Sequence, residues 1–134
     1  LMTHSTIPSF RDLIVWQKGM DIVSDIYRIT QNFPPEELYG LTNQIRRSAI
    51  SIPSNIAEGK QRYSRAEFRQ FLSISYGSSA EVETQLEIAI RLGYCSKEDC
   101  KQVQDLLVEM SRMLNVFLHK LKAKSSSTRN SIAK

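Results

Sequence analysis

Histidine and cysteine are scarce in this chain, which holds two of each. His4 lies near the start and His119 lies late, so the body of the chain offers a single imidazole and a histidine-rich metal site is excluded. Cys95 and Cys100 have no second cysteine pair and no histidine nearby, which does not match the usual zinc patterns. We expect both cysteines to be structural, and we expect no metal and no cofactor.

Long apolar runs and catalytic motifs are also missing. No apolar stretch approaches the roughly 18 residues of a membrane-spanning helix, and none is typical of a secretory leader. The chain has no glycine-rich phosphate loop, nucleophile elbow or Glu-x-x-His pair. Glu83 and Glu87 share one helix face, but without histidines a solvated acidic face is the favoured interpretation. We therefore expect a cytoplasmic protein that has no membrane partner, is not an enzyme and has no catalytic residue.

The positive charge is unevenly distributed. The net charge is +4, and four of the 18 basic residues lie after residue 121, which leaves 14 basic and 14 acidic side chains in residues 1–121. Within that neutral body, residues 44–70 hold six basic and two acidic side chains, whereas residues 81–109 hold seven acidic and three basic ones. The body therefore has a basic part and an acidic part, which could meet head to tail in a ring of subunits.

Helical periodicity covers nearly all of the chain between its two ends. Apolar residues recur every three or four positions in four segments, at about 12–32, 35–59, 64–93 and 96–122. We expect Asp12 to cap the first segment, Pro35 to begin the second and Gly59 to end it, while Ser64 and Gly93 bound the third. The connections are short, so the sequence predicts an all-α, antiparallel, up-down-up-down four-helix bundle. The predicted organisation is a flexible arm (1–9), the bundle (10–122) and a disordered basic tail (123–134).

The second segment carries two lines of side chains at helical spacing. The apolar line keeps its phase through Pro53, so we expect the proline to kink the helix without ending it; its members are Leu41, Ile45, Ala49, Ile52 and Ile56. The neighbouring line is small or polar and consists of Gln44, Ser48, Ser51, Asn55 and Glu58. Such a polar line suits hydrogen bonds inside the bundle, or a subunit contact or pore lining, and both interpretations stay open.

Six basic residues in and after this segment are candidates for nucleic-acid binding: Arg46, Arg47, Lys60, Arg62, Arg65 and Arg69. Arginine suits phosphate contacts. The alternative is ion pairing with Glu58, with Glu67 or with the acidic part of a neighbouring chain. Nearby aromatic residues are few, namely Tyr63 and Phe68, so base stacking has little support from the sequence.

Several stretches resemble one known family, the 23S rRNA intervening-sequence proteins, also called the four-helix-bundle or S23 family. They are FRDLIVWQKGMDIV, FPPEELYGLTNQIRRSAISIPSNIAEG, SRAEFRQFLSISYGSSAEVETQLEIA and RLGY, within about residues 10–121. The segment SIPSNIAEG is the most specific part, and Gly19 stands where an alanine is expected. The resemblance marks Asn55, Glu58 and Gly59 as signature positions that are structural or lie at a subunit contact.

The resemblance also implies a biological setting. It implies a bacterial, cytoplasmic bundle that forms a ring-like homopentamer. It further implies kinship with the accessory protein of diversity-generating retroelements, which binds nucleic acid and partners a reverse transcriptase. Our first hypothesis is a non-enzymatic, homo-oligomeric scaffold that binds RNA or DNA through the six basic residues. The alternative is a ring that serves as an adaptor for a protein partner without a direct nucleic-acid role.

Overall fold

The computed structural model describes the backbone of residues 9–133 and the side chains of residues 9–122, and this part of the chain contains helices and no strand. Its elements are the short 3₁₀ turn η2 (Phe10–Asp12), α1 (Ile14–Thr30), the 3₁₀ turn η3 (Pro35–Glu37), α2 (Leu41–Lys60), α3 (Arg65–Arg91) and α4 (Lys97–Ala133). The all-α, four-helix fold expected from the sequence is confirmed.

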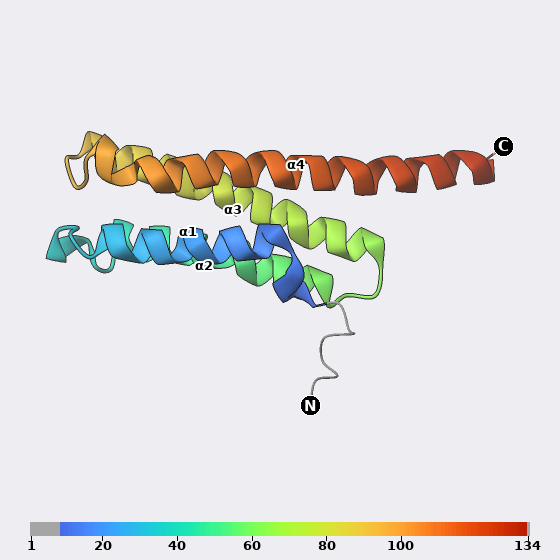
Figure 1. The fold of residues 1–134 in the computed structure, drawn as a ribbon, viewed down its shortest axis with the longest axis horizontal. Coiled ribbons are helices and arrows are strands. Elements are labelled where there is room, and N and C mark those ends of the chain that lie inside the picture. The colour runs from blue at the N-terminus through green and yellow to red at the C-terminus, as the bar shows by residue number, and fades with distance from the viewer. Residues whose placement is uncertain (1–8, 134) are drawn as a thin grey trace, which may run out of the picture.

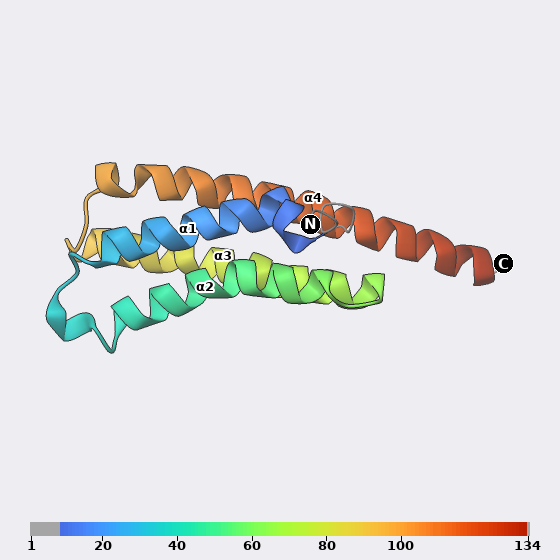
Figure 2. The ribbon, with the colours of Figure 1, turned by 60° about the horizontal axis from the view of Figure 1, so that its bottom comes forward.

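The four long helices run alternately in opposite directions. In Figure 1, α1 and α3 run toward the left and α2 and α4 run toward the right. Each helix packs against the next one along the chain, and α4 also packs against α1, which closes the bundle (Figure 2). Helix α4 extends beyond the ends of the other three helices (Figure 1). Within residues 9–133, no helix combines the length and the hydropathy that crossing a bilayer requires.

The core is built from the apolar faces that the periodicity predicts. Every helix contributes side chains with no exposed surface, including Ile22 and Ile26 from α1, Ile45, Ile52 and Ile56 from α2, Leu72, Val82 and Leu86 from α3, and Val103, Leu107, Met110 and Leu114 from α4. At roughly 1.5–3 kcal/mol for each fully buried large aliphatic side chain, these residues provide the main stabilisation of the bundle.

The first helix begins later than expected, and the expected cap at Asp12 is wrong. Asp12 closes the turn η2, because its carboxylate accepts a hydrogen bond of 3.2 Å from the N–H of Ser9. The hydroxyl of Ser9 accepts in turn from the N–H of Arg11 at 3.1 Å. Helix α1 then starts at Ile14 without a side-chain cap. Ser9 and Asp12 do form a capping pattern, but it closes the separate turn η2 that precedes the helix.

The second helix also begins later than expected. Pro35 opens only the turn η3, and α2 starts at Leu41. Glu37 links the two, because its Oε1 accepts a hydrogen bond of 3.0 Å from the N–H of Leu41. Its Oε2 accepts from the Tyr94 hydroxyl at 2.8 Å. Both hydrogen bonds stabilise the charged carboxylate and so lower the pKa of Glu37, and the bond from Leu41 is the larger cause.

Helix α2 continues through Pro53, which is buried inside it, as the unbroken apolar line predicts. The expected kink at Pro53 stays a prediction. Gly59 does not end the helix, so that expectation is wrong: the cap is Gln61, and Gly59 is buried beside α3. A Cβ at Gly59 would lie 2.7 Å from the Cβ of Phe71 and 3.0 Å from the Phe68 ring. Glycine is therefore required there for close helix packing.

The ends of α3 agree with the sequence. The hydroxyl of Ser64 accepts from the N–H of Glu67 at 3.1 Å, and Gly93 has a φ of +77° just after the helix. The backbone of α4 continues to Ala133, past the expected end near Lys122. Residues 1–8 and the side chains of residues 123–134 lie outside the described part, so the flexible arm and the disordered basic tail stay predictions.

Candidate nucleic-acid interface

The six candidate basic residues fall into two groups. Arg46 and Arg47 lie in the first half of α2, toward η3. The other four, which we call the turn cluster, surround the connection between α2 and α3 and are Lys60, Arg62, Arg65 and Arg69. The helical rise between Arg47 and Lys60 amounts to about 20 Å. The structure therefore does not bring the six residues into one patch.

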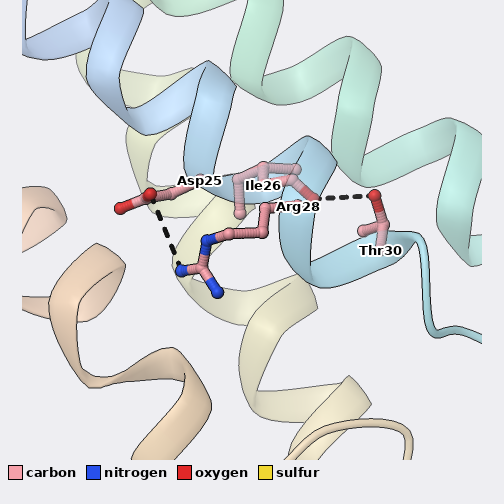
Figure 3. A network of polar contacts seen from close by, with 4 residues as sticks. All are labelled: Asp25, Ile26, Arg28 and Thr30. Atoms are coloured by element: carbon pink, nitrogen blue, oxygen red, sulfur yellow. Dashed lines mark hydrogen bonds and ion pairs between the residues drawn. The ribbon is translucent and has the colours of Figure 1, made fainter.

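Arg46 is held against α1 by two contacts. Its Nε donates a hydrogen bond of 2.8 Å to Oγ1 of Thr30, and its guanidinium carbon lies 4.4 Å from the centre of the Tyr27 ring. Thr30 is fixed in turn, because its hydroxyl donates to the carbonyl oxygen of Ile26 at 2.7 Å (Figure 3). Arg46 thus joins α1 to α2 and is only partly accessible.

A pocket of about 340 Å³ lies beside Arg46, between the end of α1, η3 and the start of α2. We call it the tyrosine pocket; it is lined by Tyr27, Leu38, Tyr39, Thr42, Asn43, Arg46, Arg47 and Ile50. Tyr39 is 90% exposed, and Arg47 is also exposed. No spacing in the sequence links Tyr27 to the arginines of α2, so sequence analysis missed these aromatic side chains. Aromatic and basic groups together are typical of single-stranded nucleic-acid sites.

The turn cluster is partly engaged within the bundle. Arg62 forms an ion pair of 2.9 Å with Glu58 one turn earlier, and its guanidinium lies 4.9 Å from the centre of the Phe71 ring. The Nε of Arg69 donates to the carbonyl oxygen of Leu118 on α4 at 3.3 Å. Arg65 is exposed and Lys60 is half-buried. Within residues 9–122, neither of these two forms an ion pair, and the same holds for Arg47.

The polar line of α2 is used mainly inside the bundle. Ser51 hydrogen-bonds to Ser78 of α3, with 2.8 Å between the two hydroxyl oxygens. The hydroxyl of Ser75 donates to the carbonyl oxygen of Ile52 at 2.9 Å. The amide of Asn55 donates to both the carbonyl and the hydroxyl of Ser51, at 2.8 and 2.9 Å. We call Ser51, Ser75 and Ser78 the serine seam.

The remaining members of the polar line are more accessible. Ser48 is half-buried, whereas Gln44 and Glu58 are exposed. Hydrogen bonding within the bundle therefore accounts for Ser51 and Asn55, and Glu58 pairs with Arg62. Gln44 and Ser48 are left for solvent or for a partner.

Acidic side chains gather in a groove of about 470 Å³ between α1 and α4, which includes Asp21, Asp25, Asp105 and Glu109. Three of them are paired. Lys18 lies 3.1 Å from Glu109, Lys101 lies 3.2 Å from Asp105, and Arg28 lies 3.7 Å from Asp25 (Figure 3). The groove lies between α1 and α4, whereas Arg47 and Lys60 lie on α2 and Arg65 begins α3, so the acidic groove and these three cations occupy different parts of the bundle.

The two cysteines lie together in a protected environment. The two sulfur atoms are 3.1 Å apart, with Cys100 buried and Cys95 half-buried. Burial raises the pKa of both thiols, and it raises the pKa of Cys95 to about 12. A thiol with so high a pKa is a poor nucleophile at neutral pH. Among the described residues, no group of three or more His, Cys, Asp or Glu side chains is placed to hold a metal ion.

Comparison with known proteins finds one matching family and several matching solved structures. The sequence profile of the 23S rRNA-intervening sequence proteins matches residues 11–116. A crystal structure from Bacteroides thetaiotaomicron VPI-5482, described as a protein of unknown function from the S23 ribosomal protein family, has 29% sequence identity and a TM-score of 0.71. The match covers 78% of this chain and 98% of that one. No curated protein matches the chain.

Proposed function

This chain belongs to the family of 23S rRNA-intervening sequence proteins, and from that premise we propose a non-enzymatic helical scaffold that assembles with itself and binds RNA or DNA. The proposed contacts are the tyrosine-pocket pair Arg46 and Arg47 and the turn cluster Lys60, Arg62, Arg65 and Arg69. The cytoplasm of a bacterium is the proposed setting. The family description links these proteins to ribosomal RNA, and the related crystal structure is of unknown function.

One observation carries the nucleic-acid part of the proposal. Arg47, Lys60 and Arg65 form no ion pair within residues 9–122. By contrast, three carboxylates of the acidic groove between α1 and α4 each form an ion pair with a lysine or an arginine. Cations without an ion-pair partner attract phosphates, and arginine can bind a phosphate through two N–H groups. The distance of about 20 Å along α2 corresponds to roughly six nucleotides of one strand at 3.4 Å each.

The test is a triple charge reversal with a matched control. We expect Arg47→Glu, Lys60→Glu and Arg65→Glu together to abolish binding of a structured RNA and of a duplex DNA at physiological salt. The control reverses three exposed cations elsewhere on α3 and α4, Arg91, Lys97 and Arg112, so that the net charge changes equally. If both triple variants weaken binding to the same degree, the contact is a general charge effect and the proposed surface is wrong.

Self-assembly is the second part of the proposal. Exposed aliphatic side chains lie on several faces of the bundle, including Ile14, Ile74, Ile88 and Val116. A basic face and an acidic groove on different sides of one chain also favour head-to-tail contacts. We propose a ring of five subunits, as the family resemblance implies. Native mass spectrometry should then give five times the chain mass of 15.4 kDa, and a monomer at micromolar concentration would refute it.

A protein-adaptor role is the alternative function, and one feature favours it. An apolar groove of about 320 Å³ between α1 and α2 is lined mainly by Trp16, Met20, Val23, Ile50, Pro53 and Ala57. Such a groove suits the apolar face of a partner helix. Capture of a specific protein that persists after nuclease treatment, and is lost in Met20→Glu, would support the adaptor. Loss of all captured protein on nuclease treatment would support nucleic-acid binding.

A further inference from the structure

We propose that the tyrosine pocket binds one unstacked nucleotide of a single-stranded RNA. This inference rests on the proposed nucleic-acid function and assigns a specific site to it. The volume of about 340 Å³ is near the lower limit of ligand pockets, which suits one nucleotide and no larger group.

The pocket offers planar groups on which a base can stack. Tyr39 lines the pocket and keeps 90% of its surface exposed. The guanidinium of Arg46 is held in place by Thr30 and by the Tyr27 ring. This guanidinium is therefore a second planar group of the pocket, besides the Tyr39 ring. Unpaired RNA bases stack on aromatic rings and on arginine planes, whereas the bases of a duplex are not accessible for stacking. These groups therefore favour a single strand.

The rim of the pocket offers a phosphate contact. Arg47 is exposed and has no ion-pair partner within residues 9–122. It lies one residue after Arg46 and lines the same pocket, so a base beside Arg46 would place its phosphate near Arg47. A guanidinium binds a phosphate oxygen pair through two parallel N–H groups.

The wall of the pocket contains a polar group that lacks a partner. The hydroxyl of Thr42 has no hydrogen-bond partner among the described residues, although the residue is only 3% exposed. A threonine in a helix has two accessible χ1 rotamers, so this hydroxyl can turn toward a ligand. The exposed amide of Asn43 beside it offers both donors and an acceptor. Together they can pair with the polar edge of a base or with the ribose 2′-hydroxyl.

The pocket differs in chemistry from the neighbouring apolar groove. Leu38 and Ile50 are its only aliphatic lining residues, whereas the adjoining groove is mostly apolar. A helix from a protein partner would need aliphatic contacts, so the tyrosine pocket fits a nucleotide better than a peptide.

The experiment compares an oligouridine single strand with an RNA duplex of equal length, both fluorescently labelled, on the full chain at physiological salt. We expect Tyr39→Ala to weaken single-strand binding by about 5- to 100-fold and to leave duplex binding unchanged. Tyr39→Phe keeps the ring and should keep the affinity. Arg47→Ala should lower the slope of log affinity against log salt by about one for the single strand.

The matched control is Tyr63→Ala, because Tyr63 is also fully exposed but lies at the turn between α2 and α3. The inference is overturned if Tyr39→Ala and Tyr63→Ala bind the single strand equally well. It is also overturned if a 4-thiouridine strand crosslinks to the turn cluster and not to the Tyr39 peptide. If the unchanged chain binds DNA but neither RNA, this inference fails and the proposed function stands. If it binds no RNA and no DNA, the proposed function itself fails, so the two failures are distinguishable.

A single-stranded DNA of the same sequence and free uridine monophosphate complete the experiment. Binding of the RNA strand that exceeds binding of the DNA strand supports a 2′-hydroxyl contact in the pocket. The inference is overturned if the RNA and DNA strands bind equally well and Tyr39→Ala weakens neither, because the strands are then bound outside the tyrosine pocket. Competition by uridine monophosphate that is lost in Tyr39→Ala supports a one-nucleotide site.

Discussion

Replacing Gly59 with alanine should destabilise the bundle, although alanine is the better helix former. The helix preference alone favours the variant by about 1 kcal/mol. Against this, the new methyl group would lie 2.7 Å from the Cβ of Phe71 and 3.3 Å from the carbonyl oxygen of Phe68. Atoms so close to the backbone cannot swing away, so the two helices must separate, and overpacking of this kind costs about 1–3 kcal/mol. The difference between these two terms is a net loss of about 0–2 kcal/mol.

Two other glycines provide matched controls for the same substitution. Gly77 is exposed within α3, and a Cβ there would meet nothing within 4 Å. Gly77→Ala should therefore stabilise the chain by about 0.5–1 kcal/mol. Gly19 is intermediate, since its Cβ would lie 3.3 Å from the Cβ of Pro53. The expected order of stability is Gly77→Ala, then Gly19→Ala, then Gly59→Ala.

Urea unfolding monitored by circular dichroism measures this order, with all variants at one protein concentration because self-association would alter the apparent stability. The melting temperature should shift by about 4 °C for each kcal/mol in a chain of this length. A Gly59→Ala variant that is more stable than the unchanged chain would refute the reasoning, because the separation of α2 and α3 would then cost less than the gain in helix preference.

Three further predictions concern pH, thiol reactivity and the serine seam. The pKa of Glu37 is lowered because its carboxylate accepts a hydrogen bond from the Leu41 N–H. The stability that this carboxylate provides is therefore present above the ordinary pKa of 4.5 and is lost as the pH falls through the lower pKa of the folded state. Acid unfolding should show this loss of stability. Cys95, with its pKa raised from 9.0 to about 12, should react with iodoacetamide about 30-fold more slowly than an ordinary thiol, as measured by mass spectrometry, because the lower thiolate fraction outweighs the greater nucleophilicity of the thiolate. Ser78→Ala should cost about 0.5–1.5 kcal/mol in urea unfolding because the hydroxyl of Ser51 loses its hydrogen bond to Ser78 and keeps only the one from Asn55.

Each of these predictions has its own control. Glu37→Gln should remove part of the acid sensitivity, and an unchanged acid transition would contradict the role given to this carboxylate. Cys95 in urea-unfolded protein should react at the ordinary rate; equal rates in folded and unfolded protein would show that burial does not protect it. The double variant of Ser51 and Ser78 to alanine should lose less stability than the sum of the single variants.

The helices and their core could be predicted because the sequence signals that specify them lie within short segments of the chain. The apolar periodicity, the cap at Ser64 and the left-handed residue Gly93 each depend on a few adjacent residues, and all agree with the structure. The continuation of α2 through Pro53 was also predictable, since the apolar line keeps its phase across the proline.

The candidate site was less predictable because its parts come from distant segments. Tyr27 reaches Arg46 only because α1 packs against α2, and Tyr39 follows a 3₁₀ turn that the sequence led us to assign to the helix itself. Gly59 was misassigned for the same kind of reason, because a glycine near a helix end is ambiguous until the neighbouring helix is placed. Linear spacing cannot show which surface a side chain shares with another helix.

The serine seam has a consequence for how related chains can diverge. Because Ser51 and Ser78 contact each other through their hydroxyls, and Ser75 bonds the backbone of Ile52, neither helix can accept a large residue here unless the other changes too. We expect exchanges at positions 51 and 78 to occur in pairs among relatives, with a larger residue on one helix offset by a smaller one on the other. Substitutions at positions 51 and 78 therefore depend on each other. Gly77, where a Cβ would meet nothing within 4 Å, can be substituted independently.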